Sequence, residues 1–596
     1  MAVIVVGLAV GQLARMAYLG GPVILDDLDF LASLGLVRQG KLAWPIFVFA
    51  TAGPHPIILW RIIYYLQWLA FGASPALFRV AIGGVQALSG GALFVLLDRY
   101  LTNRWAAVVG ALLWTVSAIG GWDNPMSVMV GGFIAWGVLW LLLAMCCVSR
   151  LADHTGWRWP LLLAACISLT MFSWGILLAV LPALVLQYLL LEHRRAIPPR
   201  RLIGWAVAWL LPMLLVGALQ VSMIIPEMGS AERQRDFSVF DIGQRVGGQL
   251  SMVAGNVFYG YTLNPDDQSL WPKSLIALAL GCAVAVWVRG RALRFVLVVA
   301  AVTLVYLWLA DMGGSELELA NVVTSGRYLY LPTLLICTAL ATLVDRLLAT
   351  LPTAAPAWRR IAWAAGGVLF ALYAIHQHGV ASRTRELFDE KAHDTTERLQ
   401  AQQQLLLALA GEASAAGTTL RVPDLPVLLS PPSHVLWTVS TFEAVMLPGR
   451  LDGLEIVPVD RCTPEDLKGT LSALSRQNTA MARAWAELLV VSWDDFQALA
   501  WLSEFASNQD APVRIFKFWM HHGDISYAID QVQAWGIERQ SPELEIVSDK
   551  RLFGRDLPEL LRRLDESPDP LARTWAVSLR QLRAEESEFG PSMTNP

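Results

Sequence analysis

Apolar runs, each close to the length needed to cross a lipid bilayer, recur along the first two thirds of the 596-residue chain. A membrane-spanning helix needs about 20 predominantly apolar residues. The runs are residues 2–20, 76–97, 105–120, 127–147, 160–191, 203–225, 272–288, 295–310, 328–345 and 361–378. This pattern predicts a polytopic α-helical membrane protein.

Composition supports that class and excludes others. Hydrophobic residues make up 55% of the chain and charged residues only 16%, far less charge than a soluble chain of this length would need. The net charge of −4 gives no global basic field, so we expect no nucleic-acid partner. Of six cysteines, only Cys462 lies in the polar C-terminal third, which rules out a disulfide framework there. The N-terminus lacks the basic start of a secretory signal, so we interpret it as an uncleaved first span.

The charges between the runs predict the topology. The run at 160–191 is too long for one upright helix, and its middle reads Ser173-Trp174-Gly175, a candidate tight turn between two short helices. Arginines cluster in five of the connecting segments, whereas 121–127 and 173–175 carry no Lys or Arg. The clusters are Arg99/Arg104, Arg150/Arg158, Arg194/Arg195/Arg200/Arg201, Arg289/Arg291/Arg294 and Arg346/Arg359/Arg360. If basic segments stay in the cytoplasm, the chain has about eleven spans, with its N-terminus inside and its C-terminus outside.

Three carboxylates follow the first apolar run directly, at the start of a long first outer loop (residues 21–75). They are Asp26, Asp27 and Asp29. Acids at the edge of a bilayer are costly and tend to be functional. A carboxylate beside a second acid can have its pKa raised toward the range useful for taking a proton from a hydroxyl. The pair could equally hold a divalent cation. The structural alternative, a helix N-cap with favourable helix-dipole charges, fits Asp29 best.

Two further stretches of the first outer loop, 27–40 and 57–71, carry apolar residues at helical spacing. Aromatic-rich amphipathic helices of this length tend to lie along a membrane interface rather than cross it. An ordinary packed connector is the alternative. The aromatic residues of the second stretch are Trp60, Tyr64, Tyr65 and Trp68.

A second motif, SGRYLYLP at 325–332, places Arg327 at the expected outer edge of the tenth span, followed by Tyr328 and Tyr330 in the aromatic belt. A guanidinium at that depth can bind a lipid phosphate through two parallel hydrogen bonds. The alternative is an interface anchor whose charged tip reaches water.

Residues 380–596 are polar and mixed, which predicts a soluble α/β domain on the outer side. Helices are expected at 383–413, from the cap Thr463-Pro464-Glu465-Asp466 onward, and at 570–585. Strands are expected at 418–429, 451–459, 488–493 and 511–520.

Taken together, three motifs over residues 1–380 resemble the GT-C glycosyltransferases, in particular the protein O-mannosyltransferase-like and related bacterial integral-membrane members. They are the acidic pair after the first span, the Pro54-His55-Pro56 element with its helix and FGASPALFR turn, and Arg-Tyr-Leu-Tyr-Leu-Pro at 327–332. Relatives often show His-Arg-Pro at the second motif, so this chain lacks the basic residue beside His55.

The resemblance implies sugar transfer from a polyprenyl-phosphate-sugar donor to a hydroxyl of a glycan, lipid or protein acceptor, at the outer face of a bacterial inner membrane. It implies a GT-C-like membrane domain at 1–379 and an extracytoplasmic domain at 380–596. Asp27 and Asp26 match the catalytic position of an inverting transferase. Arg327, Tyr328 and His55 are expected to bind substrate. No organic cofactor is implied, no G-x-x-x-x-G-K-[ST] nucleotide loop occurs, and a divalent metal remains open.

Two other function classes compete with this interpretation. A transporter or flippase usually carries ionisable groups in mid-span, but here Arg15, Arg79 and Asp98 lie near span ends. A catalytically silent relative that serves as an assembly partner would keep the acids for structural reasons, and the sequence leaves that alternative open.

Overall fold

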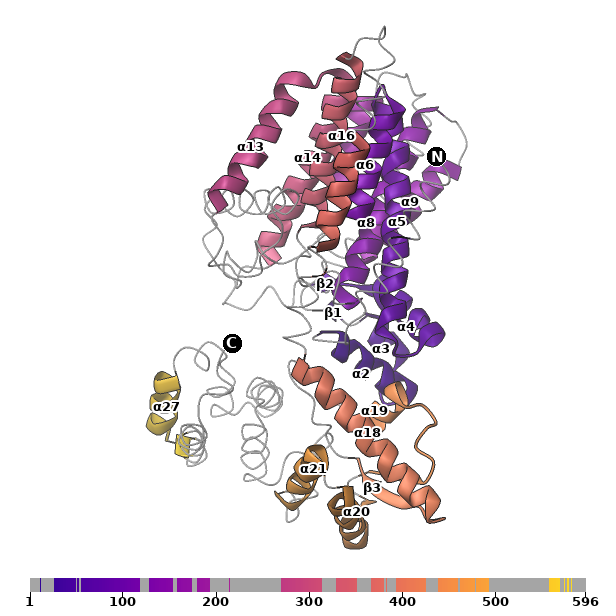
Figure 1. Ribbon diagram of the computed structural model, residues 1–596, viewed down its shortest axis with the longest axis vertical. Helices are drawn as coiled ribbons and strands as arrows, with labels where there is room; N and C mark the ends of the chain where they lie inside the picture. The colour runs from indigo at the N-terminus through magenta and orange to yellow at the C-terminus, as the bar shows by residue number, and fades with distance from the viewer. Residues whose placement is uncertain are drawn as a thin grey trace. The chain divides into compact units, whose positions relative to one another are not determined.

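The structure is a computed structural model, and the chain divides into two compact units, with many of their elements labelled in Figure 1. The first unit comprises Met1–Pro22 and Trp44–Lys391, and the second comprises Val23–Ala43 and Ala392–Pro596. The residues that the structure describes are 11, 26–49, 51–52, 55–117, 128–153, 158–173, 180–192, 214, 270–313, 329–350, 366–379, 382, 393–424, 438–458, 461–477, 479–491, 557–568, 573, 576–577 and 580. A short early segment therefore belongs with the C-terminal third of the chain.

The first unit is built from helices that pack side by side. α5 packs against α6 and α8, α8 also packs against α9, and α6 packs on α16, which contacts α13 and α14. In chain order its described helices are α3 (Trp44–Phe49), α4 (Ile58–Phe71), α5 (Pro75–Tyr100), α6 (Arg104–Val116), α8 (Val128–Asp153), α9 (Arg158–Ser173), α10 (Val180–Gln187), η2 (Tyr188–Glu192), α13 (Leu270–Trp287), α14 (Gly290–Gly313) and α16 (Tyr330–Thr350), with residues 366–379 also helical.

Four of the described helices are long and apolar enough to cross a membrane. They are Ala76–Tyr100, Gly132–Leu151, Gly290–Leu307 and Tyr330–Thr350. Large apolar side chains such as Leu88 and Leu304 are exposed on them, as expected for surfaces that face lipid rather than water. Apart from residues 11 and 214, the predicted runs at 2–20 and 203–225 lie outside the described residues, so the eleven-span topology stays a prediction.

Within the long run at 160–191 the structure describes two helices, and the predicted turn at Ser173-Trp174-Gly175 falls largely on residues 174–179, which lie outside the described residues. α9 ends at Ser173, and the next described helix, α10, begins at Val180. α10 continues into η2, one turn of π-helix. α10 packs against α8, α9 and α14.

Glycine allows the helices to approach closely where α6 meets α16. A β-carbon on Gly110 would lie 2.6 Å from Leu97 Cδ1 and 2.7 Å from Ala341 Cβ. Small residues at such crossings let helix backbones pack closely in membrane proteins. Gly110 therefore fixes the separation of these helices.

A buried polar cluster joins α5, α8 and η2. Arg99 donates to both carboxylate oxygens of Glu192, at 2.9 Å and 2.8 Å, and to Asp153 at 2.5 Å. The Tyr100 hydroxyl donates to Glu192 Oε1 at 2.9 Å, and Gln187 donates to that hydroxyl at 2.9 Å. Each buried charge thus has an ionic partner, the condition for tolerating charge inside a protein.

The second unit combines helices with a pair of parallel strands. β3 pairs with β4 in parallel, with α19 between them in sequence, and α20 packs on β3. Its described elements are α2 (Asp26–Arg38), α18 (His393–Ala415), β3 (Leu420–Pro423), α19 (Val439–Met446), β4 (Leu454–Val457), α20 (Pro464–Gln477), α21 (Ala480–Val491) and α27 (Leu557–Glu566). The predicted segments 418–429 and 451–459 thus contain strands, and the helix of 383–413 is described from His393 onward.

The start of α20 has the predicted reciprocal cap. The Thr463 amide donates to Asp466 Oδ2 at 2.9 Å, and the Asp466 amide donates to Thr463 Oγ1 at 3.2 Å. Burial alone would raise the pKa of the Asp466 carboxyl, but the Thr463 groups and the nearby Arg421 guanidinium hold that pKa below its ordinary value.

The strand predicted at 488–493 is wrong, because residues up to Val491 belong to helix α21. The Thr479 hydroxyl accepts from the Ala482 amide at 3.1 Å, so helix formation starts well before the apolar run. Trp485 is fully buried and donates to Gln402 of α18 at 2.9 Å. This packing overrides the β propensity of Leu488–Val491. The strand predicted at 511–520 lies outside the described residues.

Candidate functional site

The three candidate acids occupy the first turn of a helix. α2 begins at Asp26 and continues through Asp27 and Asp29 to Arg38. Acidic residues in a first turn interact favourably with the partial positive charge of the helix N-terminus. Neighbouring helical positions lie about 100° apart around the axis, so Asp26 and Asp27 occupy different faces. The structure describes their backbone and not their side chains.

The helix that carries these acids belongs to the second unit, which the sequence did not indicate. α2 packs against α19. Gly35 of α2 lies so close to α19 that an added β-carbon would be 2.8 Å from Val445 and 2.9 Å from Thr441. A contact between segments some 400 residues apart leaves no local pattern in the sequence.

His55 lies in a short hairpin of the first unit, directly before α4. β1 (Thr51–Ala52) pairs antiparallel with β2 (His55–Pro56), with Ala52 opposite His55. The helices predicted at 27–40 and 57–71 are present as α2 and α4. The His55 side chain is not among those described, so its substrate-binding role stays a prediction.

The aromatic residues of α4 are mostly packing residues. Trp60, Tyr64 and Trp68 are buried, and the position of Trp60 leaves no room for a β-carbon on Gly132 of α8. The side chains that α4 exposes are instead aliphatic, with Leu66 and Leu69 both more than half exposed. The i, i+4, i+8 spacing of these three aromatic residues places them on one packed face of α4, and the interfacial position predicted for this helix stays a prediction.

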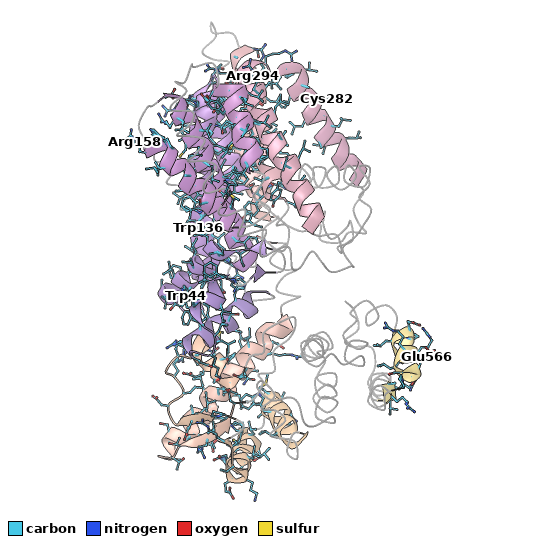
Figure 2. All side chains as sticks on the ribbon, turned by 180° about the vertical axis from the view of Figure 1, so that it is seen from behind. Trp44, Trp136, Arg158, Cys282, Arg294 and Glu566 are labelled. Atoms are coloured by element: carbon cyan, nitrogen blue, oxygen red, sulfur yellow. The ribbon has the colours of Figure 1, made fainter. Side chains whose placement is uncertain are left out.

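A small apolar surface lies on α3 and α4. Trp44, labelled in Figure 2, is partly exposed, and its ring centroid lies 4.5 Å from that of Tyr65. Ile46 and Phe49 on α3 are at least half exposed. Exposed apolar side chains on short helices are typical of segments that rest on a membrane.

Arg327 and Tyr328 lie just before the part of this segment that the structure describes, which resumes at Leu329. Tyr330 is the first residue of α16 and is buried, with its ring centroid 6.2 Å from that of Trp114 on α6. Tyr330 is thus a core residue, and its predicted place in an aromatic belt is wrong. The C-terminal half of the motif, from Leu329 onward, is therefore packed in the core.

Two buried arginines on α4 and α5 were not predicted as functional. Arg79 is only 1% exposed and Arg61 only 7% exposed. The Arg61 guanidinium lies over the Phe47 ring at 5.3 Å, and burial lowers the pKa of Arg61 to about 10, which leaves it charged at neutral pH. An arginine inside an apolar run, as at Arg79, is the sequence signal that could have indicated them.

Within the described residues, no group of three or more His, Cys, Asp or Glu side chains could hold a metal ion. Asp26, Asp27 and Asp29 lie outside that statement, because their side chains are not described. Two neighbouring carboxylates are a donor set that suits a hard divalent cation.

No protein-family model and no curated protein sequence matches the chain. Among solved structures, it is similar to the archaeal oligosaccharyltransferase AglB from Archaeoglobus fulgidus, in complex with an inhibitory peptide and a dolichol-phosphate. That similarity has a TM-score of 0.36 and 13% identity, over 76% of this chain and 64% of AglB. The chain is also similar to ArnT from Cupriavidus metallidurans bound to undecaprenyl phosphate, with a TM-score of 0.34 and 14% identity, over 79% of this chain and 88% of ArnT.

Proposed function

We propose that this protein is an integral-membrane glycosyltransferase of the GT-C type. It moves a sugar from a polyprenyl-phosphate-linked donor to an acceptor hydroxyl at the outer membrane face. The acceptor is a glycan, a lipid or a protein. The observation that carries the proposal is the acid pair Asp26–Asp27 in the first turn of α2, directly after the first apolar run of a chain that has membrane-length helices.

The transfer needs one base and one activated leaving group. Asp27 takes the proton from the acceptor hydroxyl, whose oxygen forms a bond to the anomeric carbon of the sugar. The bond between that carbon and the phosphate oxygen breaks on the opposite side, and the polyprenyl phosphate leaves with the electron pair. The configuration at the anomeric carbon is thereby inverted. Because the leaving phosphate is already activated, the reaction needs no nucleotide.

The donor phosphate is assigned to Arg327, with Tyr328 and His55 beside the donor. A guanidinium binds two phosphate oxygens in a planar, bidentate arrangement that an ammonium cannot reproduce. Tyr328 directly follows Arg327 in sequence, and His55 lies three residues before the start of α4. These assignments follow the motifs of the sequence.

The deciding experiment measures transfer by Asp27→Asn and Asp26→Asn variants. Membrane vesicles that contain the full chain receive a panel of radiolabelled undecaprenyl-phosphate monosaccharides, and label is followed into glycan, lipid and protein fractions. Asn keeps the size of Asp and removes the proton acceptor. Turnover of Asp27→Asn should fall roughly 100- to 10,000-fold, with binding of undecaprenyl phosphate unchanged.

Asp29→Asn is the matched control, because Asp29 lies in the same helical turn and is expected to serve the helix dipole alone. It should retain near wild-type turnover. A chain that transfers no sugar from the panel, or acid-pair variants that turn over like wild type, would reject the proposal in favour of a silent assembly partner. Loss of wild-type turnover on addition of EDTA would assign the second carboxylate to a divalent cation.

A further inference from the structure

The helix that carries the acid pair is held by the C-terminal part of the chain. We infer that the second unit positions Asp26 and Asp27 for catalysis, and that Gly35, Arg38 and Lys41 are positioning residues that act through α2. This inference rests on the proposed function, because it needs an acid of α2 to be the base. Figure 1 shows α19 beside α2, and both helices belong to the second unit.

Close backbone packing is the first of three contacts. A β-carbon on Gly35 would lie 2.8 Å from Val445 Cγ2, 2.9 Å from Thr441 Cγ2 and 3.0 Å from the Thr441 carbonyl oxygen. One of these neighbours is backbone and cannot rotate away. A larger residue at position 35 therefore requires the Val445 and Thr441 side chains to shift, or α2 to move away from α19.

The second contact lies one helical turn further along α2. Arg38 Nη1 donates to the carbonyl oxygen of Ala444 at 2.8 Å. Ala444 lies in the last turn of α19, where carbonyl groups lack partners within their own helix and the helix dipole favours a cation. Arg38 therefore satisfies a carbonyl of the C-terminal domain from the end of the acid-bearing helix.

The third contact connects α2 to the strand pair. Lys41 Nζ lies 3.5 Å from Asp424 Oδ2 and 3.2 Å from Ser440 Oγ. Asp424 accepts hydrogen bonds from the Ser440 amide at 2.8 Å and hydroxyl at 2.7 Å, and its own amide donates to Val457 of β4 at 2.9 Å. Lys41 is half exposed, so this pair contributes less than the packing at Gly35.

These contacts can set the position of Asp26 and Asp27 because α2 connects them as a single helix. Gly35 lies nine positions after Asp26, which is roughly 13 Å along a helix at about 1.5 Å per residue. A tilt of about 10° at Gly35 would then shift the first turn by roughly 2 Å. A displacement of about 1 Å at a reacting group can cost about 100-fold in rate. The C-terminal domain can therefore control catalysis without touching substrate.

The donor-binding residues proposed above belong to the first unit, so variants at Gly35 should affect turnover and spare donor binding. Gly35→Ala in the full chain should lower kcat at least 10-fold, while affinity for undecaprenyl phosphate stays within twofold. The triple variant Gly35→Ala with Thr441→Ser and Val445→Ala removes both methyl groups that the new β-carbon meets and should recover part of kcat.

The control is Gly411→Ala on α18 of the same unit, where a β-carbon meets no atom within 4 Å. It should leave kcat unchanged. Because Gly35→Ala could also impair folding, Arg38→Met serves as a milder second variant. It removes the hydrogen bond to Ala444 and should raise amide hydrogen exchange in peptides covering residues 26–34 while lowering kcat severalfold.

Asp27→Asn and Asp26→Asn are measured in the same assay. If an acid variant loses turnover while Gly35→Ala and Arg38→Met both turn over like wild type, the positioning inference is wrong and the proposed function stands. If neither acid variant changes turnover, the proposed function fails and the inference fails with it. A loss of kcat in Gly35→Ala that the triple variant recovers, with donor affinity unchanged, supports both.

Discussion

The ring of Trp60 occupies the space where Gly132 would carry a side chain. Trp60 is fully buried on α4, and a β-carbon built on Gly132 of α8 would overlap three atoms of its six-membered ring. The Trp60 centroid also lies 5.6 Å from that of Tyr64, which in turn contacts Phe78 at 4.9 Å. The absence of a side chain at Gly132 thus makes room for the Trp60 indole, and this contact packs α4 against α8.

Gly132→Ala should destabilise the protein by about 1–3 kcal/mol, the usual cost of inserting atoms into a packed core. Thermal unfolding of the purified chain in detergent measures the effect. Gly91→Ala on α5 is the control, because its β-carbon meets no atom within 4 Å. It should be neutral or slightly stabilising. Trp60→Phe makes room, so adding it to Gly132→Ala should cost less than the sum of the single effects.

The cluster around Glu192 gives a second prediction about stability. Glu192→Ala removes the carboxylate to which the buried Tyr100 hydroxyl donates, and it leaves Arg99 with Asp153 as its carboxylate partner among the described residues. Breaking a buried ion pair from one side costs about 3–5 kcal/mol, and we expect the lower end because Asp153 remains. The double variant Arg99→Met with Glu192→Leu should be more stable than Glu192→Ala in urea unfolding. If Glu192→Ala unfolds at the wild-type midpoint, the cluster contributes no stability.

Local patterns were sufficient for several elements. The cap at Thr463 and Asp466 follows from a spacing that satisfies two backbone amides within one turn. The helical spacing of 57–71 gave α4 to within one residue at its start.

Long-range packing decided what the sequence could not indicate. The apolar run Leu488–Val491 looks like a strand, but Trp485 and the Thr479 cap make it part of α21. Similarly, the sequence around Tyr330 predicts a residue of an aromatic belt, but Tyr330 is buried against Trp114 of α6. The assignment of α2 to the second unit depends on Thr441 and Val445, which lie far from Gly35 in the chain. For the candidate site, the sequence predicted the acid pair but gave no sign that the helix carrying it packs against α19.

Stability of the second unit should depend on pH through Asp466. The pKa of this carboxyl is lower in the folded protein than its ordinary value of about 3.9. Its contribution to stability is therefore present above that value and is lost as the pH falls through it toward the folded-state pKa. Urea unfolding midpoints of wild type and Asp466→Asn, measured from pH 7 to pH 3, should differ most at pH 7 and converge toward pH 3. A constant difference would contradict this.

The topology is testable with reporter fusions. If the arginine clusters are cytoplasmic, a reporter that is active only outside the cytoplasm should work when fused after Gly417, beyond the end of α18. It should be inactive when fused at Arg195. Activity at Arg195, or inactivity after Gly417, would overturn the eleven-span topology and place the C-terminal domain inside.

The last prediction concerns the phosphate of the donor. If Arg327 binds it through two parallel hydrogen bonds, Arg327→Ala should weaken binding of undecaprenyl phosphate by about 1.5–3 kcal/mol, the range for hydrogen bonds to charged groups. Arg327→Lys should recover only part of the loss, because an ammonium cannot donate in the same planar geometry. Titration of lipid into the detergent-solubilised chain measures the affinity, with Arg346→Ala, at the other end of α16, as the control. Equal affinity in wild type and Arg327→Ala would leave Arg327 as an interface anchor and remove it from the donor site.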